Sequence, residues 1–234
     1  MKSYVIHPVL GRVIINPRRD AVRFIARWKN GEVNLTIPPG SSREKVMEVL
    51  DRLAPRLLDK KKDVAYYDGQ VVECPGLRIH ISSQSVKPDK VLGSAKLPEA
   101  FVEVGTALPF DSPDTTKVVS RMLEQVAAYV ADDLLIPRAA ALADELGLKV
   151  SKWSISRGHR VLGSCNSRRE IKLSHVLVFM PLELRDYIVW HELAHLTEMS
   201  HNARFHALCD RYCHGQERRL IAALHAFRYP ILRH

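Results

Sequence analysis

Two histidines and a glutamate near the C-terminal end of the chain have the spacing of a metal-binding helix. His191, Glu192 and His195 form the pattern H-E-x-x-H within an apolar run that begins at Tyr187. Because an α-helix has about 3.6 residues per turn, residues four apart lie on one face, and the two imidazoles can bind one ion. Glu192 lies beside that face, where it can accept a proton from a water molecule on the metal. The pattern predicts a hydrolytic zinc site.

A catalytic zinc ion needs a third protein ligand and an open position for water. His201 follows the motif by six residues, and we expect it to be that ligand, with His206 as the main alternative and His214 as a more distant one. In an unbroken helix His201 would lie roughly 9 Å further along the axis than His195, too far to share the ion. The helix must therefore end before His201.

The turn that brings His201 back lacks the residue that would make it easiest. A glycine would fit best where Glu198 stands, because glycine adopts left-handed backbone conformations without strain. Ser200 or Asn202 can instead cap the following helix. We therefore expect the chain to reverse direction between residues 199 and 202.

The predicted reaction is hydrolysis of a peptide bond, with Zn2+ as the cofactor and a peptide or protein as the substrate. Zinc lowers the pKa of a water molecule, Glu192 takes its proton, and the nucleophile attacks a polarised carbonyl. Tyr212, His206 and Asn166 are candidates for the group that stabilises the oxyanion. The alternative within the hydrolases is cleavage of a phosphoanhydride in a nucleotide, although the sequence has no glycine-rich phosphate loop.

Three further residues have side chains that can bind metal. His175 precedes the motif in a predicted strand and can join the site, although a single histidine in a strand is more often in the core or on the surface. Cys209 and Cys213 are four residues apart on a predicted apolar helix. Their surroundings favour two small buried hydrophobic side chains over a structural second zinc site.

Length and composition indicate a globular protein of the cytoplasm. With 234 residues and 46% hydrophobic content, the chain can bury a substantial core. Its four cysteines are few and irregularly placed, so we expect no disulfide framework. Residues 1–17 contain no leader-like apolar core, and no run reaches the length of a membrane span. We therefore expect no association with a membrane.

The formal charge of +9 and pI near 9.5 would suit a polyanionic partner. The basic clusters are short, lie far apart in the sequence, and are not accompanied by a nucleic-acid-binding motif: they are Arg18-Arg19, Lys60-Lys61-Lys62, Arg168-Arg169 and Arg218-Arg219. Binding to nucleic acid, by a basic module with a structural zinc, is therefore kept as the alternative from a different class of function.

The N-terminal part of the chain is predicted to be rich in strands. Alternating apolar residues on both sides of Asn30-Gly31 predict a β-hairpin over residues 21–37 with a type I′ turn, and residues 13–15 suggest another strand. Ser41 and Glu44 form a capping box ahead of an amphipathic helix that ends near residue 60. Short strands between residues 66 and 108 predict a small antiparallel region.

The elements around the motif are predicted to be two helices, two strands and then three helices. A helix that starts at Asp111-Ser112-Pro113 and has helical apolar spacing over residues 118–135 should end or kink at Pro137. A second helix over 138–146 would complete a helical hairpin behind the motif helix. Strands are predicted over residues 148–157 and 171–178, and the exposed edge of the second could bind an extended peptide. The motif helix begins after Pro181, and helices over 202–213 and 216–229 follow, with Gly215 between them.

The predicted fold class is therefore α+β. Residues 1–108 form an N-terminal β-rich region with one amphipathic helix, and residues 109–234 form the catalytic region, with helices and an antiparallel sheet. The two regions are either separate or parts of one continuous domain.

The C-terminal part of the sequence resembles the YgjP-like family of predicted zinc metallopeptidases, which are related to the WLM proteases. The residues that carry the resemblance are Gly163-Ser164-Cys165, Ile171 to Val178, Pro181, Tyr187 to His195, Ser200-His201 and Phe205. The resemblance implies a zincin-like peptidase core with His191, His195 and His201 on zinc and Glu192 as the base, without a known substrate. Leu162 and His206 stand where the family often has tryptophan, which affects only the expected shape of the substrate cleft.

Overall fold

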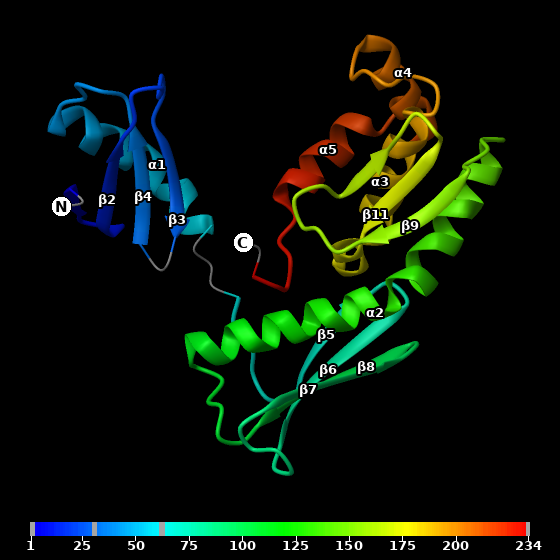
Figure 1. The fold of residues 1–234 in the computed structure, drawn as a ribbon, viewed down its shortest axis with the longest axis horizontal. Coiled ribbons are helices and arrows are strands. Elements are labelled where there is room, and N and C mark those ends of the chain that lie inside the picture. Colours follow the sequence, from blue (N-terminus) through cyan, green and yellow to red (C-terminus); the bar gives the residue numbers. More distant parts are fainter. Residues whose placement is uncertain (1–2, 30–31, 61–63, 233–234) are drawn as a thin grey trace. The chain divides into compact units, whose positions relative to one another are not determined.

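The computed structural model describes residues 3–29, 32–60 and 64–232, and the chain divides into two compact units, residues 1–63 and 64–234. The fold is of the α+β class, as predicted, with helices and mixed sheets in both units (Figure 1). The predicted boundary between residues 108 and 109 lies inside the second unit, because the sheet before it and the helix after it share one core. No described helix is long and apolar enough to cross a membrane.

The first unit is a four-stranded sheet covered by one helix. Its strands are β1 (Ser3–His7), β2 (Gly11–Pro17), β3 (Ile25–Lys29) and β4 (Glu32–Ile37), in the sheet order β1-β2-β4-β3, and its helix is α1 (Arg43–Lys60). The strands β2 and β4 are parallel and the outer pairs are antiparallel. Alternate residues of β4 are buried, and they pack with the apolar face of α1, which includes Val46, Leu50 and Leu57.

The predicted hairpin and helix of this unit are confirmed with small shifts. The strands β3 and β4 pair antiparallel up to Lys29 and Glu32, while the predicted turn at Asn30-Gly31 lies outside the described residues. The first strand of this hairpin, β3, starts at Ile25 instead of near residue 21 as predicted, and Val22 is exposed. At the start of α1, Ser42 rather than Ser41 accepts the capping hydrogen bond, from the backbone N–H of Lys45.

The second unit begins with a sheet of the same topology as the first. Its strands are β5 (Gln70–Cys74), β6 (Leu77–Gln84), β7 (Val91–Lys96) and β8 (Glu99–Gly105), in the order β5-β6-β8-β7. The prediction of a purely antiparallel region is wrong for the central pair, because β6 and β8 are parallel. Both sheets thus consist of two antiparallel hairpins joined along a parallel pair and followed by a helix.

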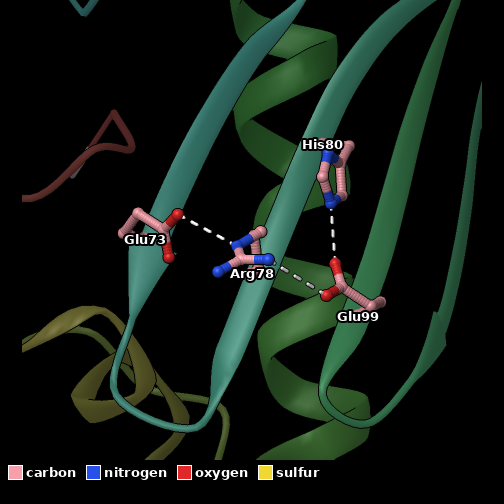
Figure 2. Close-up of polar contacts among 4 residues, drawn as sticks. All are labelled: Glu73, Arg78, His80 and Glu99. Carbon is pink, nitrogen blue, oxygen red and sulfur yellow. Dashed lines mark hydrogen bonds and ion pairs between the residues drawn. The ribbon is translucent and has the colours of Figure 1, made fainter.

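The outer face of this second sheet carries polar side chains. Arg78 of β6 contacts Glu73 of β5 and Glu99 of β8, and His80 contacts Glu99 as well (Figure 2). The Arg78 side chain is 52% exposed, so these ion pairs are solvated and contribute little to stability. The opposite face is apolar and packs against α2.

The helix α2 (Pro113–Glu145) is continuous, so the predicted helical hairpin is wrong. Pro137 lies inside it and removes one backbone hydrogen bond. Buried residues on both sides of the proline, such as Leu135 and Ala139, hold the helix on the core, and this burial outweighs the loss. Figure 1 shows that α2 changes direction along its length, which is the expected consequence of a proline in a helix.

A three-stranded sheet and three helices complete the second unit. The strands β9 (Lys152–Ser156), β10 (Gly163–Cys165) and β11 (Glu170–Ser174) lie in the order β10-β11-β9. The predicted antiparallel sheet is wrong for one pair, because β11 is antiparallel to β10 but parallel to β9. The helices are α3 (Leu182–Ala194), α4 (Ala203–Tyr212) and α5 (Glu217–Ala226). As predicted, Gly215 lies between the last two, with a positive φ of 79°.

The predicted strand over residues 171–178 is wrong in its second half. The chain leaves β11 at Ser174 and forms the 3-10 helix η1 (His175–Phe179), whose five residues are all buried. Ser174 Oγ accepts a hydrogen bond from the backbone N–H of Val176 and so caps η1. A short run that is apolar on all sides has no periodicity by which a strand can be told from a helix.

Candidate metal centre

The helix α3 and the turn that follows it position the residues of the H-E-x-x-H motif. His191 and Glu192 lie in the last turn of α3, and His195 is the residue that ends the helix. Other positions of α3, including Leu184, Tyr187 and Leu193, are buried in the apolar core. This packing fixes the rotation of the helix and therefore the direction of the histidine face.

The helix ends before His201, as predicted, but its tight turn follows His195 directly and so begins earlier than the predicted reversal between residues 199 and 202. The backbone N–H groups of Thr197 and Glu198 bond to the carbonyl of Ala194 in a tight turn. Asn202 then caps α4 by accepting a hydrogen bond from the backbone N–H of Phe205, at 3.0 Å. Glu198 does not have a positive φ, since Arg169 and His214 are the described non-glycine residues that do. The turn therefore does not require the missing glycine.

This turn brings His201 to the two histidines of α3. The three side chains place one ligand atom each within 4.8 Å of one another. The Nε2 atoms of His191 and His201 are 3.1 Å apart, close to the separation of roughly 3.3 Å between two nitrogens on a tetrahedral zinc ion. The geometry needed for a shared metal ion is present, while the role of these residues as ligands stays a prediction.

A buried aromatic ring lies beneath the three imidazoles. Phe205 of α4 is fully buried, and the centroid of its ring is 4.8 Å from that of His191, 4.5 Å from that of His195 and 4.7 Å from that of His201. In the sequence Phe205 is marked only by the family resemblance, which implies no role for it. Its position indicates that it orients the histidine rings by packing.

The surroundings of the histidines favour free nitrogen lone pairs. Burial, together with the neighbouring imidazoles, lowers the pKa of His191 to about 4, and burial lowers the pKa of His195 as well. His195 Nδ1 lies 3.1 Å from the carbonyl oxygen of Glu198. When Nδ1 donates to this carbonyl, Nε2 carries the lone pair, which is the arrangement typical of histidines that bind metals.

Glu192 is buried beside a glycine of the small sheet. Its side chain is 4% exposed, and burial raises its pKa to about 8. A Cβ on Gly163 of β10 would lie 2.5 Å from Oε1 of Glu192 and 2.8 Å from its Cδ. Only a glycine leaves room for the carboxylate here. This role of Gly163 could not be predicted from the sequence, because the close approach joins β10 to α3.

The other candidates named from the sequence lie elsewhere or have other partners. His175 does not join the three histidines, since it belongs to a different group of side chains with Glu124 and His159. Neither His206 nor His214 belongs to either group found in the described part of the chain. Cys209 lies in α4, Cys213 is the C-cap of that helix, and both are buried. Burial raises the pKa of Cys209 to about 12, which fits the predicted apolar role.

Among the oxyanion candidates, His206 has the most suitable surroundings. Asn166 is occupied within the β10–β11 turn, where its amide bonds to Glu170 and its oxygen accepts two backbone N–H groups. Tyr212 is 7% exposed. His206 Nδ1 lies 2.9 Å from Glu217 Oε1, which leaves Nε2 as the nitrogen that can face a substrate.

Comparison with protein-family models shows which family the chain belongs to. A family model described as YgjP-like, metallopeptidase domain, matches residues 23–220. The chain belongs to the YgjP-like family. The match extends from β3 to α5, so this YgjP-like chain carries the family's elements in both of its units. No curated protein and no solved structure gives a significant match to it. Membership implies a metal cofactor, and the three converging histidines of this YgjP-like protein are a candidate site for it.

Proposed function

We propose that this chain is a zinc-dependent peptidase with a zincin-like catalytic core, in which His191, His195 and His201 hold the metal and Glu192 is the general base. The observation that carries the proposal is the convergence of three imidazoles next to a buried carboxylate on the same helix. Its four cysteines are free, which fits a reducing compartment and supports the cytoplasm as the place of action.

The donor set fits zinc. Three imidazoles are a known ligand set of catalytic zinc sites, and two of the histidines are held in the neutral form by burial. Zinc bound there would lower the pKa of a water molecule and polarise a carbonyl group. Glu192 would accept a proton from the attacking water and pass it to the leaving amine. Its carboxylate becomes ionised near neutral pH when positive charge lies beside it, because a nearby cation lowers the pKa of a carboxyl group.

The small sheet supports an extended peptide as the substrate. The strand predicted to bind it, β11, lies in the centre of the sheet, so both of its edges are paired. β10 is an edge strand, and its Gly163 contacts Glu192. A peptide that pairs with the outer edge of β10 by main-chain hydrogen bonds would run past the catalytic carboxylate. This arrangement favours a peptide over a nucleotide.

His206 is the residue we assign to the oxyanion. Glu217, whose own backbone N–H donates to Asp210, holds the His206 ring through Nδ1. His206 Nε2 would then donate to the oxygen of the tetrahedral intermediate. Loss of one oxyanion-stabilising donor reduces kcat by about 10²- to 10³-fold in enzymes that have an oxyanion hole.

The test compares Glu192→Gln with Glu183→Gln on the same helix, where Glu183 makes an exposed ion pair with Arg219. Glu192→Gln should keep stoichiometric zinc and lower kcat on a peptide library by about 10²- to 10⁴-fold. The control, Glu183→Gln, should keep the zinc content and the kcat of the wild type. Wild-type protein without zinc after metal-replete expression would contradict the proposal. Nucleotide hydrolysis that requires Glu192, without any peptide cleavage, would replace it with the phosphoanhydride reaction.

A specific observation also favours a nucleic-acid partner for the first unit. Residues 1–63 contain 14 of the 35 lysines and arginines but 7 of the 26 acidic residues, so they carry +7 of the net charge of +9. A groove of 530 Å³ beside β3 is lined by Arg18, Arg23 and Arg27 together with Trp28. Arginines bind phosphates, and their clustering on one face is the electrostatic pattern of polyanion binding.

The nucleic-acid proposal predicts binding that depends steeply on salt. Single-stranded and double-stranded oligonucleotides should bind the full chain at 50 mM salt and dissociate as salt rises. Arg23→Ala/Arg27→Ala should weaken binding and reduce the salt slope, whereas Arg78→Ala on the second unit should not. Binding that is unaffected by the double substitution would show that this groove is not the surface.

A further inference from the structure

A second group of metal-type side chains lies in the unit formed by residues 64–234. Glu124 of α2, His159 of the β9–β10 connection and His175 of η1 place one ligand atom each within 4.8 Å of one another. The group shares no residue with the three histidines of the candidate metal centre. Each of its members comes from a different segment of the chain, so only the tertiary fold brings them together.

His175 has the surroundings of a metal-binding histidine. It is 2% exposed, and its Nδ1 lies 3.1 Å from the carbonyl oxygen of Ser156. Donation from Nδ1 to this carbonyl leaves the lone pair on Nε2 and fixes the plane of the ring. Burial lowers the pKa of His175, so the ring stays neutral at neutral pH and does not repel a cation.

Glu124 and His159 are already at the separation that a bound metal requires. Oε2 of Glu124 is 3.3 Å from Nε2 of His159, which matches roughly 3.3 Å between two ligands of a tetrahedral zinc ion. The rings of His159 and His175 meet edge to face, with centroids 5.4 Å apart. Ser174 Oγ donates to the carbonyl of Gly158 and ties the His159 segment to the start of η1.

A hollow next to the group gives room for a fourth ligand. It has a volume of 330 Å³ and lies between Glu124 and His175, with Arg121 and Arg157 in its walls. Both arginines are exposed, so water screens their repulsion of a cation. Together with a divalent ion they would favour an anion or a hydroxide in the fourth position.

We propose that Glu124, His159 and His175 form a second metal site, for a divalent transition-metal ion such as zinc. Two imidazoles and one carboxylate are a known ligand set for zinc and for ferrous iron. Without a metal the same side chains form a polar contact between Glu124 and His159 beside a buried histidine. The proposal is independent of the peptidase mechanism, because no residue is shared.

Zinc stoichiometry of the full chain separates the two sites. Wild-type protein should bind two zinc ions. His191→Ala/His195→Ala/His201→Ala should bind one, and Glu124→Gln/His159→Gln should also bind one. We chose Glu124 and His159 because their side chains are 20% and 28% exposed, so their replacement disturbs the core less than that of His175. His225→Gln, a change at an exposed histidine outside both groups, should leave two.

The cobalt form of the triple-histidine variant gives a second readout, because it should absorb visible light. Combining Glu124→Gln/His159→Gln with the three histidine substitutions should remove this absorption. Zinc should also raise the Tm of the triple-histidine variant, since binding to the folded state alone stabilises it. A folded triple-histidine variant that binds no metal overturns the second site while leaving the peptidase proposal intact. A triple-histidine variant that keeps both zinc ions overturns the first site instead.

Discussion

The contact between Gly163 and Glu192 provides a test at the scale of single residues. In Gly163→Ala the new Cβ would lie 2.5 Å from Oε1 of Glu192, so the carboxylate must move. Because a misplacement of about 1 Å can reduce turnover about 10²-fold, kcat should fall by that order while zinc content stays the same. Gly158→Ala is the matched control, since its Cβ would meet nothing within 4 Å. Unchanged kcat in Gly163→Ala would argue against Glu192 as the base.

The buried carboxyl group of Glu192 also predicts how the stability of the metal-free protein depends on pH. Burial raises its pKa to about 8, from an ordinary value of 4.5. Between these values the folded state keeps a proton that the unfolded chain has lost, so stability falls as pH rises, by at most about 1.4 kcal/mol per pH unit. His191, whose pKa is lowered to about 4, acts in the opposite direction, because its contribution is lost as pH falls below about 6.5.

Above pH 6.5 the contribution of Glu192 should therefore dominate. Urea unfolding in the presence of a chelator should give a lower free energy of unfolding at pH 8 than at pH 6.5. In Glu192→Gln this difference should disappear, since the amide does not titrate. A wild-type protein that becomes more stable over this interval would show that Glu192 is already ionised in the folded state.

At the scale of the elements, Arg185 joins α3 to its neighbours. Its buried guanidinium donates to the carbonyl oxygens of Met180 and Val178 at the end of η1, and of Pro75 in the β5–β6 turn. Arg185→Met would leave these acceptors without partners and should lower the free energy of unfolding by about 3 kcal/mol. Arg78→Met, at the exposed ion pairs of Figure 2, should change it by less than about 0.5 kcal/mol. Chemical denaturation of both variants gives the comparison, and equal effects would contradict the tethering role.

Some helices and strands could be predicted from the sequence and others could not. The hairpin of β3 and β4, the helix α1 and the helix α3 follow from local periodicity and capping residues. The continuous α2 and the 3-10 helix η1 do not, because packing on the core decides whether a proline bends or ends a helix and whether an all-apolar run is strand or helix. Both errors concern segments that are buried on several sides.

At the scale of the whole molecule, the two units have separate apolar cores. One core is built from residues between 10 and 57 and the other from residues between 66 and 231. Every candidate metal ligand lies in the second unit. A fragment of residues 64–234 should therefore fold, bind as much zinc as the full chain, and lose binding to nucleic acid. Circular dichroism, metal analysis and oligonucleotide titration test this, and loss of zinc from a folded fragment would contradict it.

The sequence by itself determined which side chains of the candidate metal centre share a face of α3, because the H-E-x-x-H spacing sets this through helix geometry alone, and Asn202 caps the next helix locally. The tertiary structure decided everything that joins distant segments. It placed Phe205 under the three imidazoles and Gly163 against Glu192, and it moved His175 out of the predicted site to Glu124 and His159. Such contacts depend on how the elements pack against one another, and the spacing of the residues along the chain does not predict that packing.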